Sequence, residues 1–269
     1  MTVLAAVAIL AAAVAAGTIN AVVGSGSLIT FPTLLAFGFP PVVANVSNNI
    51  GVIPGNITAS IGYRRELAGQ RRRLTPLAVA SFAGSLTGAV ALLALPAGVF
   101  KFVVPILILA GCLLVVLQPQ LSGWVAKRNK DRADPVGTEA DGTEADGTRR
   151  SDSSPILLAG VFLTGVYGGY FGAAQGVILV GLLGVFISDN LQRINAGKNV
   201  LVTIVNATAA VIFVIFAHVA WLAVALIAVG SAAGGVVGAR VGRRLPPLAL
   251  RIIIVTIGLV SAVKLIFFP

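Results

Sequence analysis

The feature that most restricts the fold of this chain is a series of apolar runs, each about as long as a lipid bilayer is thick. A transmembrane helix needs about 20 apolar residues, because each residue adds about 1.5 Å along the helix axis. Runs of that length lie at 2–23, 41–62, 75–95, 98–118, 190–217, 221–241 and 247–268. We therefore expect an all-α polytopic membrane protein surrounded by membrane lipids.

Two further apolar runs, 27–38 and 176–187, are only about half as long as a membrane span. The first follows Gly24-Ser25-Gly26, and the second follows a glycine-rich stretch from Gly168 to Gly176. Because glycine lets the backbone leave helical geometry, we expect broken or re-entrant half-helices at these two places.

Composition and charge exclude several classes of protein. The chain is 57% hydrophobic and 10% charged, with a net charge of +10. Its arginines lie between apolar runs rather than on a solvated face, so we expect no nucleic-acid partner. The apolar runs contain no acidic residue except Asp189 at a turn, and one histidine (His218) with one cysteine (Cys112) cannot build a metal centre or a hydrolytic triad. We therefore predict no enzymatic activity, no cofactor and no metal site.

Residues 127–154 differ from the rest of the chain because they are rich in charged residues, Gly and Thr. The pentapeptide Gly-Thr-Glu-Ala-Asp occurs twice there, at 137–141 and 142–146. Such a segment has too little apolar surface to fold, so we interpret it as a disordered cytoplasmic linker. It separates a first transmembrane repeat, 1–126, from a second, 155–269.

Shifting the sequence by 150 residues aligns the two halves without a gap. Asparagine is scarce inside membranes, and chance alignment of several asparagines is therefore improbable. Three pairs align: Asn45 with Asn195, Asn49 with Asn199, and Asn56 with Asn206. Internal duplication of this kind is typical of transporters.

Basic residues indicate that the two halves have opposite orientations in the membrane. The loop at 62–74 carries five arginines, whereas its counterpart at 217–220 carries no Lys or Arg. The next pair is reversed, because 96–100 is uncharged and 240–246 carries three arginines. Since loops rich in Lys and Arg stay cytoplasmic, we expect two inverted five-segment repeats, with the linker inside and both termini outside.

The aligned asparagines form the first candidate binding site. Asn45 and Asn49, like Asn195 and Asn199, are four residues apart and therefore share one helical face. Lys198 lies on the second of these faces, and an ionisable group inside a membrane is by default functional. We interpret the faces as a polar pathway in which Lys198 binds an anion. The alternatives are amides that only bond neighbouring helices and a lysine that reaches the headgroups.

The glycine breaks form the second candidate site. The N–H groups at the start of each following half-helix, together with the helix dipole, can bind an anion. Side chains and glycines that would take part are Ser25, Gly26, Ser27, Gln175 and Gly176. The alternative is that the glycines only allow helices to pack closely.

Two other glycine pairs, Gly84 with Gly88 and Gly234 with Gly238, have a four-residue spacing. This spacing of small residues is typical of closely packed membrane helices. We therefore predict helix contacts there rather than a binding site.

The order of these features resembles a known family. Glycine-rich stretches at Gly17–Gly26 and Gly165–Gly176 each precede a short apolar run, and Pro32 and an asparagine-bearing segment follow the first. In this the chain is similar to the sulfite exporter family of TauE and SafE type over nearly its whole length, apart from the linker. The resemblance implies a multi-pass permease of the bacterial inner membrane for sulfur-containing anions such as sulfite, sulfonates or sulfoacetate.

The residues and the resemblance both point to a secondary transporter, and we expect it to export a small anionic substrate. A passive anion channel, or a permease that takes up thiosulfate or sulfonate, would use the same residues. An anion arriving beside Lys198 would favour uptake of a proton, so the sequence leaves a coupling proton open without identifying the coupling ion. The sequence also leaves a homodimer open.

Overall fold

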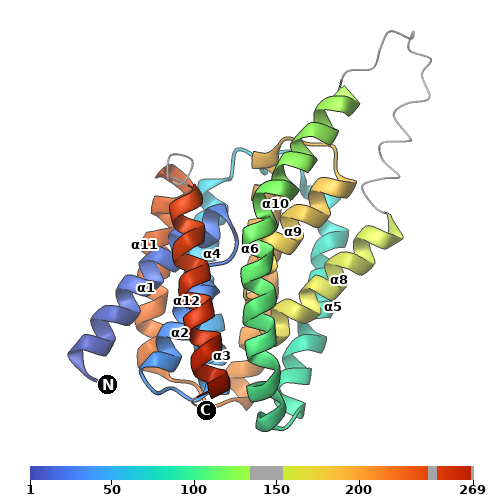
Figure 1. Cartoon of the computed structure of the whole chain (residues 1–269). Coiled ribbons are helices and arrows are strands. Elements are labelled where there is room, and N and C mark those ends of the chain that lie inside the picture. The colour runs from blue at the N-terminus through green and yellow to red at the C-terminus, as the bar shows by residue number, and fades with distance from the viewer. Residues whose placement is uncertain (134–153, 242–246, 268–269) are drawn as a thin grey trace, which may run out of the picture.

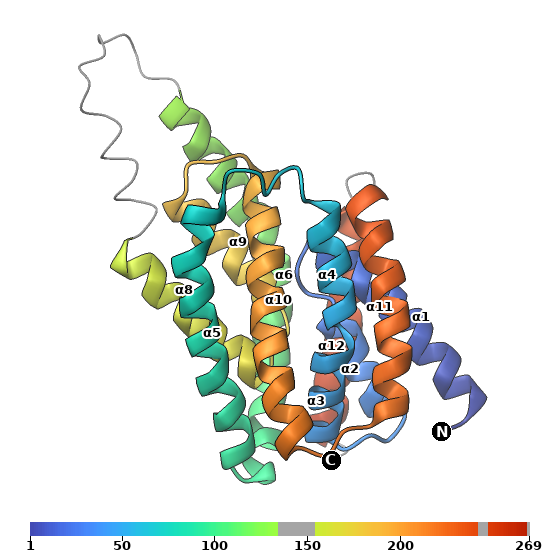
Figure 2. The same ribbon diagram turned by 180° about the vertical axis from the view of Figure 1, so that it is seen from behind.

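The computed structural model describes residues 1–133, 154–241 and 247–267. All regular secondary structure in these ranges is helical (Figures 1 and 2), so the prediction of an all-α chain is confirmed. The helices are α1 (Val3–Val22), α2 (Ser27–Ala36), α3 (Pro41–Gly51), α4 (Ile53–Gly62), α5 (Arg71–Ala94), α6 (Ala97–Ala133), α8 (Pro155–Tyr170), α9 (Gln175–Phe186), α10 (Leu191–Phe216), α11 (Trp221–Val241) and α12 (Pro247–Phe267).

Helices at equivalent positions of the two halves make equivalent contacts. The helices α3, α5 and α6 begin at residues 41, 71 and 97, and α10, α11 and α12 begin at 191, 221 and 247, so each start differs by 150. α1 packs along α11 as α8 packs along α5, and α6 packs on α12. In Figure 2, α5 runs downward whereas α11 runs upward. The contacts are those expected of a duplicated chain, while the inverted orientation of the halves in a membrane stays a prediction.

The four-residue glycine pairs lie where two helix pairs approach most closely. A Cβ atom placed on Gly84 would lie 2.1 Å from the carbonyl oxygen of Phe162, so α5 and α8 touch backbone to backbone. A Cβ atom on Gly234 would likewise lie 2.1 Å from the carbonyl oxygen of Val14, in the contact of α11 with α1. The predicted packing role of these glycines is therefore confirmed.

Five described helices are long and apolar enough to cross a membrane: Val3–Val22, Arg71–Ala94, Gly98–Gln120, Leu191–Phe216 and Trp221–Arg240. The described apolar part of α12, Arg251–Val263, is shorter than these five. The two short runs after the glycine breaks form α2 and α9, of 10 and 12 residues, as predicted.

The prediction of one continuous span at 41–62 is wrong. The segment divides into α3 and α4 at Val52. Pro54 in the first turn of α4 has no backbone N–H, so the regular ladder of helical hydrogen bonds is interrupted there. Ser231 of α11 donates its hydroxyl to the carbonyl oxygen of Gly51 over 2.9 Å, which satisfies an acceptor at the break.

The apolar core lies around the short helices. Phe31 of α2 and Phe171, which follows α8, belong to one buried apolar cluster and pack edge to face with ring centroids 5.1 Å apart. Val177 of α9 belongs to the same cluster. The breaks that precede α2 and α9 are therefore held inside the protein.

The two ends of the molecule are distinguished by their loops. The loop at 63–70 and the end of α6 lie at one end, which we call the arginine end because of the arginines in this loop (Figure 1). The start of α1 and the end of α12 lie at the opposite end. Loops predicted to be cytoplasmic and extracytoplasmic thus lie apart, while the side of the membrane that each end faces stays a prediction.

The structure describes only the beginning of the predicted linker. Residues 127–133 are helical and continue α6. Residues 134–153, which include both copies of the repeated pentapeptide, lie outside the described residues. The boundaries of the two predicted repeats, 1–126 and 155–269, stay a prediction.

Candidate functional site

The two glycine breaks contact each other inside the protein. The N–H group of Gly176 donates to the carbonyl oxygen of Gly24 over 3.1 Å. A Cβ atom placed on either glycine would lie 2.5 Å from the Cα atom of the other. Gly24 has a φ of 86°, a left-handed conformation that glycine adopts without steric cost. Backbone therefore packs directly on backbone at this contact, which we call the glycine junction.

Lys198 of α10 lies beside the glycine junction. Its side chain is completely buried, with 0% exposure, and its Cδ atom lies 3.3 Å from the position of a Cβ atom on Gly24. Nζ donates to the carbonyl oxygen of Asn20 over 2.9 Å. An ammonium group can donate three hydrogen bonds, yet the ion pairs of the described residues do not include Lys198. A positive charge here is thus held by a neutral acceptor.

The paired asparagines cap the broken helices of the opposite half. Asn195 and Asn199 donate their Nδ2 groups to the carbonyl oxygen of Ala21, in the last turn of α1, over 3.0 and 3.4 Å. Asn45 of α3 likewise donates to the carbonyl oxygen of Tyr170, the last residue of α8, over 2.9 Å. The last carbonyl groups of a helix have no partner within it, so these amides satisfy acceptors at each break. The amide donors of these three asparagines therefore stabilise the ends of broken helices.

Asn20 connects these elements, although it was not among the predicted site residues. Its Oδ1 atom accepts the N–H of Gly26 over 3.5 Å, and its Nδ2 group donates to Oδ1 of Asn56. Lys198 in turn donates to the carbonyl oxygen of Asn20. Asn20 therefore contacts three parts of the chain: the break before α2, α4 and α10. An asparagine inside an otherwise apolar run was the signal in the sequence that could have identified it.

Several polar side-chain atoms of the candidate residues are buried and have no hydrogen-bond partner among the described residues. Burying a polar atom without a hydrogen-bond partner lowers the stability of the folded protein by about 1–3 kcal/mol, and native proteins contain few such atoms. Those of the site are Oγ of Ser25, Oε1 and Nε2 of Gln175, Oδ1 of Asn49, Oδ1 of Asn195 and Nδ2 of Asn56. Ser25, Gln175, Asn49 and Asn195 thus combine burial with unused hydrogen-bonding capacity.

The first N–H groups of α9 form hydrogen bonds within the protein. In α9, the N–H groups of residues 175–178 bond to the carbonyl oxygens of residues 24, 172 and 174. At α2, the N–H of Gly26 bonds to a side chain, and Ser27 is only half-buried at the first helical residue. At α9 the N–H groups are thus bonded within the protein, while anion binding by backbone N–H groups at the start of α2 stays a prediction.

A cluster of charged side chains joins α5 to α10 at the arginine end. Oδ2 of Asp189 lies 2.9 Å from Nη1 of Arg73 and 2.9 Å from Nε of Arg193. Burial acts to raise the pKa of Asp189, but the hydrogen bonds from Arg193 and Arg73 outweigh it and hold this pKa below its ordinary value. Gln70 is buried beside them and donates to the carbonyl oxygen of Arg193 over 3.2 Å. Arg193 thus belongs to this cluster, apart from the Lys198 site.

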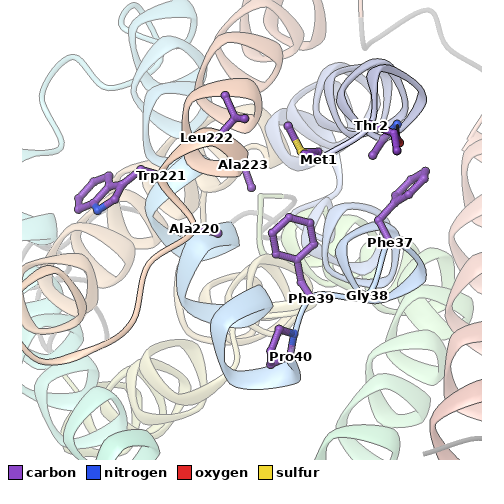
Figure 3. A pocket seen from close by; sticks show the side chains of 11 residues that line it. Met1, Thr2, Phe37, Gly38, Phe39, Pro40, Ala220, Trp221, Leu222 and Ala223 are labelled. Carbon is purple, nitrogen blue, oxygen red and sulfur yellow. Dashed lines mark hydrogen bonds between the residues drawn. The ribbon is translucent and has the colours of Figure 1, made fainter.

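Two pockets lie at opposite ends of the molecule, and neither is lined by Lys198. The pocket at the arginine end has a volume of about 460 Å³. The pocket at the opposite end, of about 710 Å³, lies between the start of α1, the α2–α3 connection and the start of α11 (Figure 3). Ala220 at its edge donates its N–H to Oγ of Ser47 over 2.9 Å, and Ser47 lies on the same helix as Asn45 and Asn49. The side chain of Lys198 itself is completely buried and is not part of the lining of either pocket.

These features define a class of protein: a helical, multi-pass membrane protein in which a buried lysine lies beside two broken helices. Comparison with known proteins gives the family. Residues 9–265 match the family described as Sulfite exporter TauE/SafE, and the chain belongs to this family of membrane transporters.

Similar proteins are named as transporters. The chain is 27% identical over 256 residues to the "Probable membrane transporter protein YfcA" of Escherichia coli (strain K12), covering 95% of this chain and 87% of that protein. It is 26% identical over 252 residues to a "Probable membrane transporter protein" of Haemophilus influenzae, covering 94% and 91%. A "Probable membrane transporter protein ORF9" of Sinorhizobium sp is 26% identical over 267 residues, covering 96% and 91%. No solved structure matches the chain.

Proposed function

We propose that this protein is a secondary transporter that exports small sulfur-containing anions, such as sulfite, sulfonates or sulfoacetate, across the bacterial inner membrane. The observation that carries the proposal is the complete burial of Lys198 with a neutral carbonyl oxygen as its partner. The family description names sulfite, and this directs the choice of anion. The substrate crosses the membrane without chemical change.

The electrostatics of the site favour an anionic substrate. Moving an ammonium group out of water is costly, and a buried charge is stable only when it is paired and hydrogen-bonded. The residues around Lys198 offer neutral groups, including the carbonyl oxygen of Asn20. An oxyanion would supply the missing negative charge and accept the remaining N–H bonds of the ammonium group.

Unused side-chain donors near the breaks would complete the binding site. Ser25 and Gln175 are each 1% exposed, and the hydroxyl of Ser25 and the amide of Gln175 lack partners among the described residues. Sulfite and sulfonates present three oxygen atoms that accept hydrogen bonds. We assign these two side chains, with Lys198, to the recognition of the sulfur-bound oxygens.

The burial of the site favours a transporter over a channel. A passive anion channel needs a continuous polar path, whereas Lys198 is closed off from the pockets at both ends. A buried site can exchange its ligand only if the protein opens, and opening toward one end at a time is the alternating access of secondary transporters. Alternating opening also allows transport against a gradient.

The purified protein in liposomes tests the proposal. We expect thermal stabilisation by sulfite or a sulfonate in a panel that also contains thiosulfate and sulfate. We expect the stabilising anion to move against its own gradient when a pH gradient is imposed. Movement only down its own gradient would identify a channel. Accumulation on the side of the arginine end, which is predicted to be cytoplasmic, would identify an uptake permease. No binding or movement of any of these anions would contradict the proposal.

A further inference from the structure

The pocket at the arginine end is distinct from the buried site. It has a volume of about 460 Å³ and lies between the segment 64–67, the first two turns of α5, and α10. Arg64 and Arg71 are exposed and provide its positive charge. Leu67, Leu74, Ala78 and Val200 provide most of the rest of its lining.

The two arginines of this pocket are available to bind an anion. The ion pairs of the described residues include Arg73 of the same segment but neither Arg64 nor Arg71. In the sequence 62–74, five arginines stand against one acid, Glu66, so the local charge is strongly positive. Arg71 is also the first residue of α5, where the positive end of the helix dipole adds to this potential.

The position of the pocket combines this charge with an apolar surface that faces lipid. Both α5 and α10 are long and apolar enough to cross a membrane, and the pocket lies beside the start of α5. Directly after Ala78 on α5, Val79 and Phe82 are 63% and 51% exposed, as expected of side chains that contact acyl chains. The pocket therefore lies where the headgroups of one leaflet meet its hydrocarbon.

We propose that this pocket binds one anionic phospholipid of the leaflet at the arginine end. The headgroup phosphate lies between Arg64 and Arg71, and an acyl chain follows Leu74, Ala78 and Val200. A small free anion would use the two arginines but would leave the apolar wall uncovered, so the whole lining fits an amphiphile better.

Such a lipid would also act on the packing beside the buried site. Leu74 is 8% exposed, and its Cδ2 atom lies 3.2 Å from the position of a Cβ atom on Gly197, the neighbour of Lys198. A lipid in contact with Leu74 and Val200 therefore bridges α5 and α10 next to this contact. Its acyl chain would thus add to the contact that already holds α5 against α10.

Mass spectrometry of the intact protein, released from detergent with added phosphatidylglycerol or phosphatidylcholine, tests the proposal. We expect one tightly retained phosphatidylglycerol and no comparably retained phosphatidylcholine. Each arginine near a membrane surface contributes about a factor of five to the binding of an anionic lipid, so the double variant Arg64→Gln/Arg71→Gln should bind phosphatidylglycerol about 30-fold more weakly. The matched control, Arg65→Gln/Arg72→Gln, removes the same charge from arginines that do not line the pocket.

A variant of the apolar lining and a small phosphate-bearing ligand distinguish a lipid site from a small-anion site. Ala78→Trp fills the apolar part of the pocket and should abolish retention while both arginines stay in place. An equal loss of retention in the control double variant would show diffuse attraction and would overturn the proposal. Thermal stabilisation by glycerol 3-phosphate as strong as that by phosphatidylglycerol, and unaffected by Ala78→Trp, would also overturn it in favour of a small-anion site.

Discussion

Gly176 donates its backbone N–H to the carbonyl oxygen of Gly24 over 3.1 Å, and this bond joins the break of one half of the chain to the break of the other. The contact is possible because neither residue has a side chain, since a Cβ atom on either would lie 2.5 Å from the Cα atom of the other. The stem of Lys198 packs against the same point. The positions of the two broken helices and of the buried cation therefore depend on one another.

The glycine junction predicts a graded effect of alanine substitutions. Gly24→Ala puts an alanine into the left-handed conformation, which costs about 1–2 kcal/mol of stability. The added Cβ atom also overlaps its neighbours, which costs about 1–3 kcal/mol more. Gly38→Ala is the matched control, because Gly38 also has a positive φ, 82°, but nothing within 4 Å of an added Cβ atom. We expect thermal unfolding in detergent to show a clearly larger loss for Gly24→Ala. Equal losses would contradict the packing described here.

We expect the amide of Gln175 to destabilise the ligand-free protein and to strengthen binding of the transported anion. Both polar atoms of its amide are buried without a partner among the described residues, so Gln175→Met keeps the volume and removes about 1–3 kcal/mol of unfavourable burial. We expect the melting temperature of the ligand-free protein to rise and the affinity for the transported anion to fall about tenfold, the loss of one hydrogen bond to a charged ligand. A lower melting temperature with unchanged affinity would show that the amide serves only the fold.

The ion pairs of Asp189 predict a pH dependence of stability. The pKa of Asp189 is lowered in the folded protein, so its stabilising effect is present above the unfolded pKa of about 3.9 and is lost as the pH falls through the lower folded value. Asp189→Asn should lower stability by about 1 kcal/mol at neutral pH, because partly exposed ion pairs contribute little. Thermal unfolding from pH 7 to pH 3 should show the difference between wild type and variant shrinking below about pH 4. A difference that grows on acidification would contradict the assignment.

The expected topology can be measured with single cysteines in a Cys112→Ala background. Ala68 in the arginine-end loop and His218 at the opposite end are both exposed, so cysteine at either position is accessible from its own side. In intact cells an impermeant thiol reagent should label His218→Cys and leave Ala68→Cys unlabelled until the membrane is opened. Labelling of Ala68→Cys in intact cells would reverse the topology.

The fold was largely predictable because lipid imposes simple requirements on length and apolarity. The positions of α2 and α9 followed from short apolar runs behind glycine-rich stretches, and the equivalent helix starts followed from the asparagine alignment. The break at Val52 was missed because apolarity does not report helix continuity. The adjacent Pro54 and Gly55 were nevertheless in the sequence and indicate an interruption.

The types of polar residue that lie beside the breaks were predictable from the sequence, but the contacts that each of them makes were not. The structure brings Lys198, Asn195 and Asn199 together with the first break. The sequence could not show that the amide groups of Asn195 and Asn199 donate to the carbonyl oxygen of Ala21. This contact depends on how one half of the chain packs on the other. Their spacing showed only that they share a helical face.

Replacement of Lys198 tests the central claim most directly. Lys198→Met keeps the stem that packs at the glycine junction and removes the charge, while Arg65→Met removes one positive charge from an exposed loop as a control. In liposomes, we expect Lys198→Met to fold but to bind and transport sulfite at least about tenfold more weakly, the loss of a hydrogen bond to a charged group, and Lys198→Arg to keep part of the activity. Transport by Lys198→Met at the unmodified rate and affinity would contradict the account.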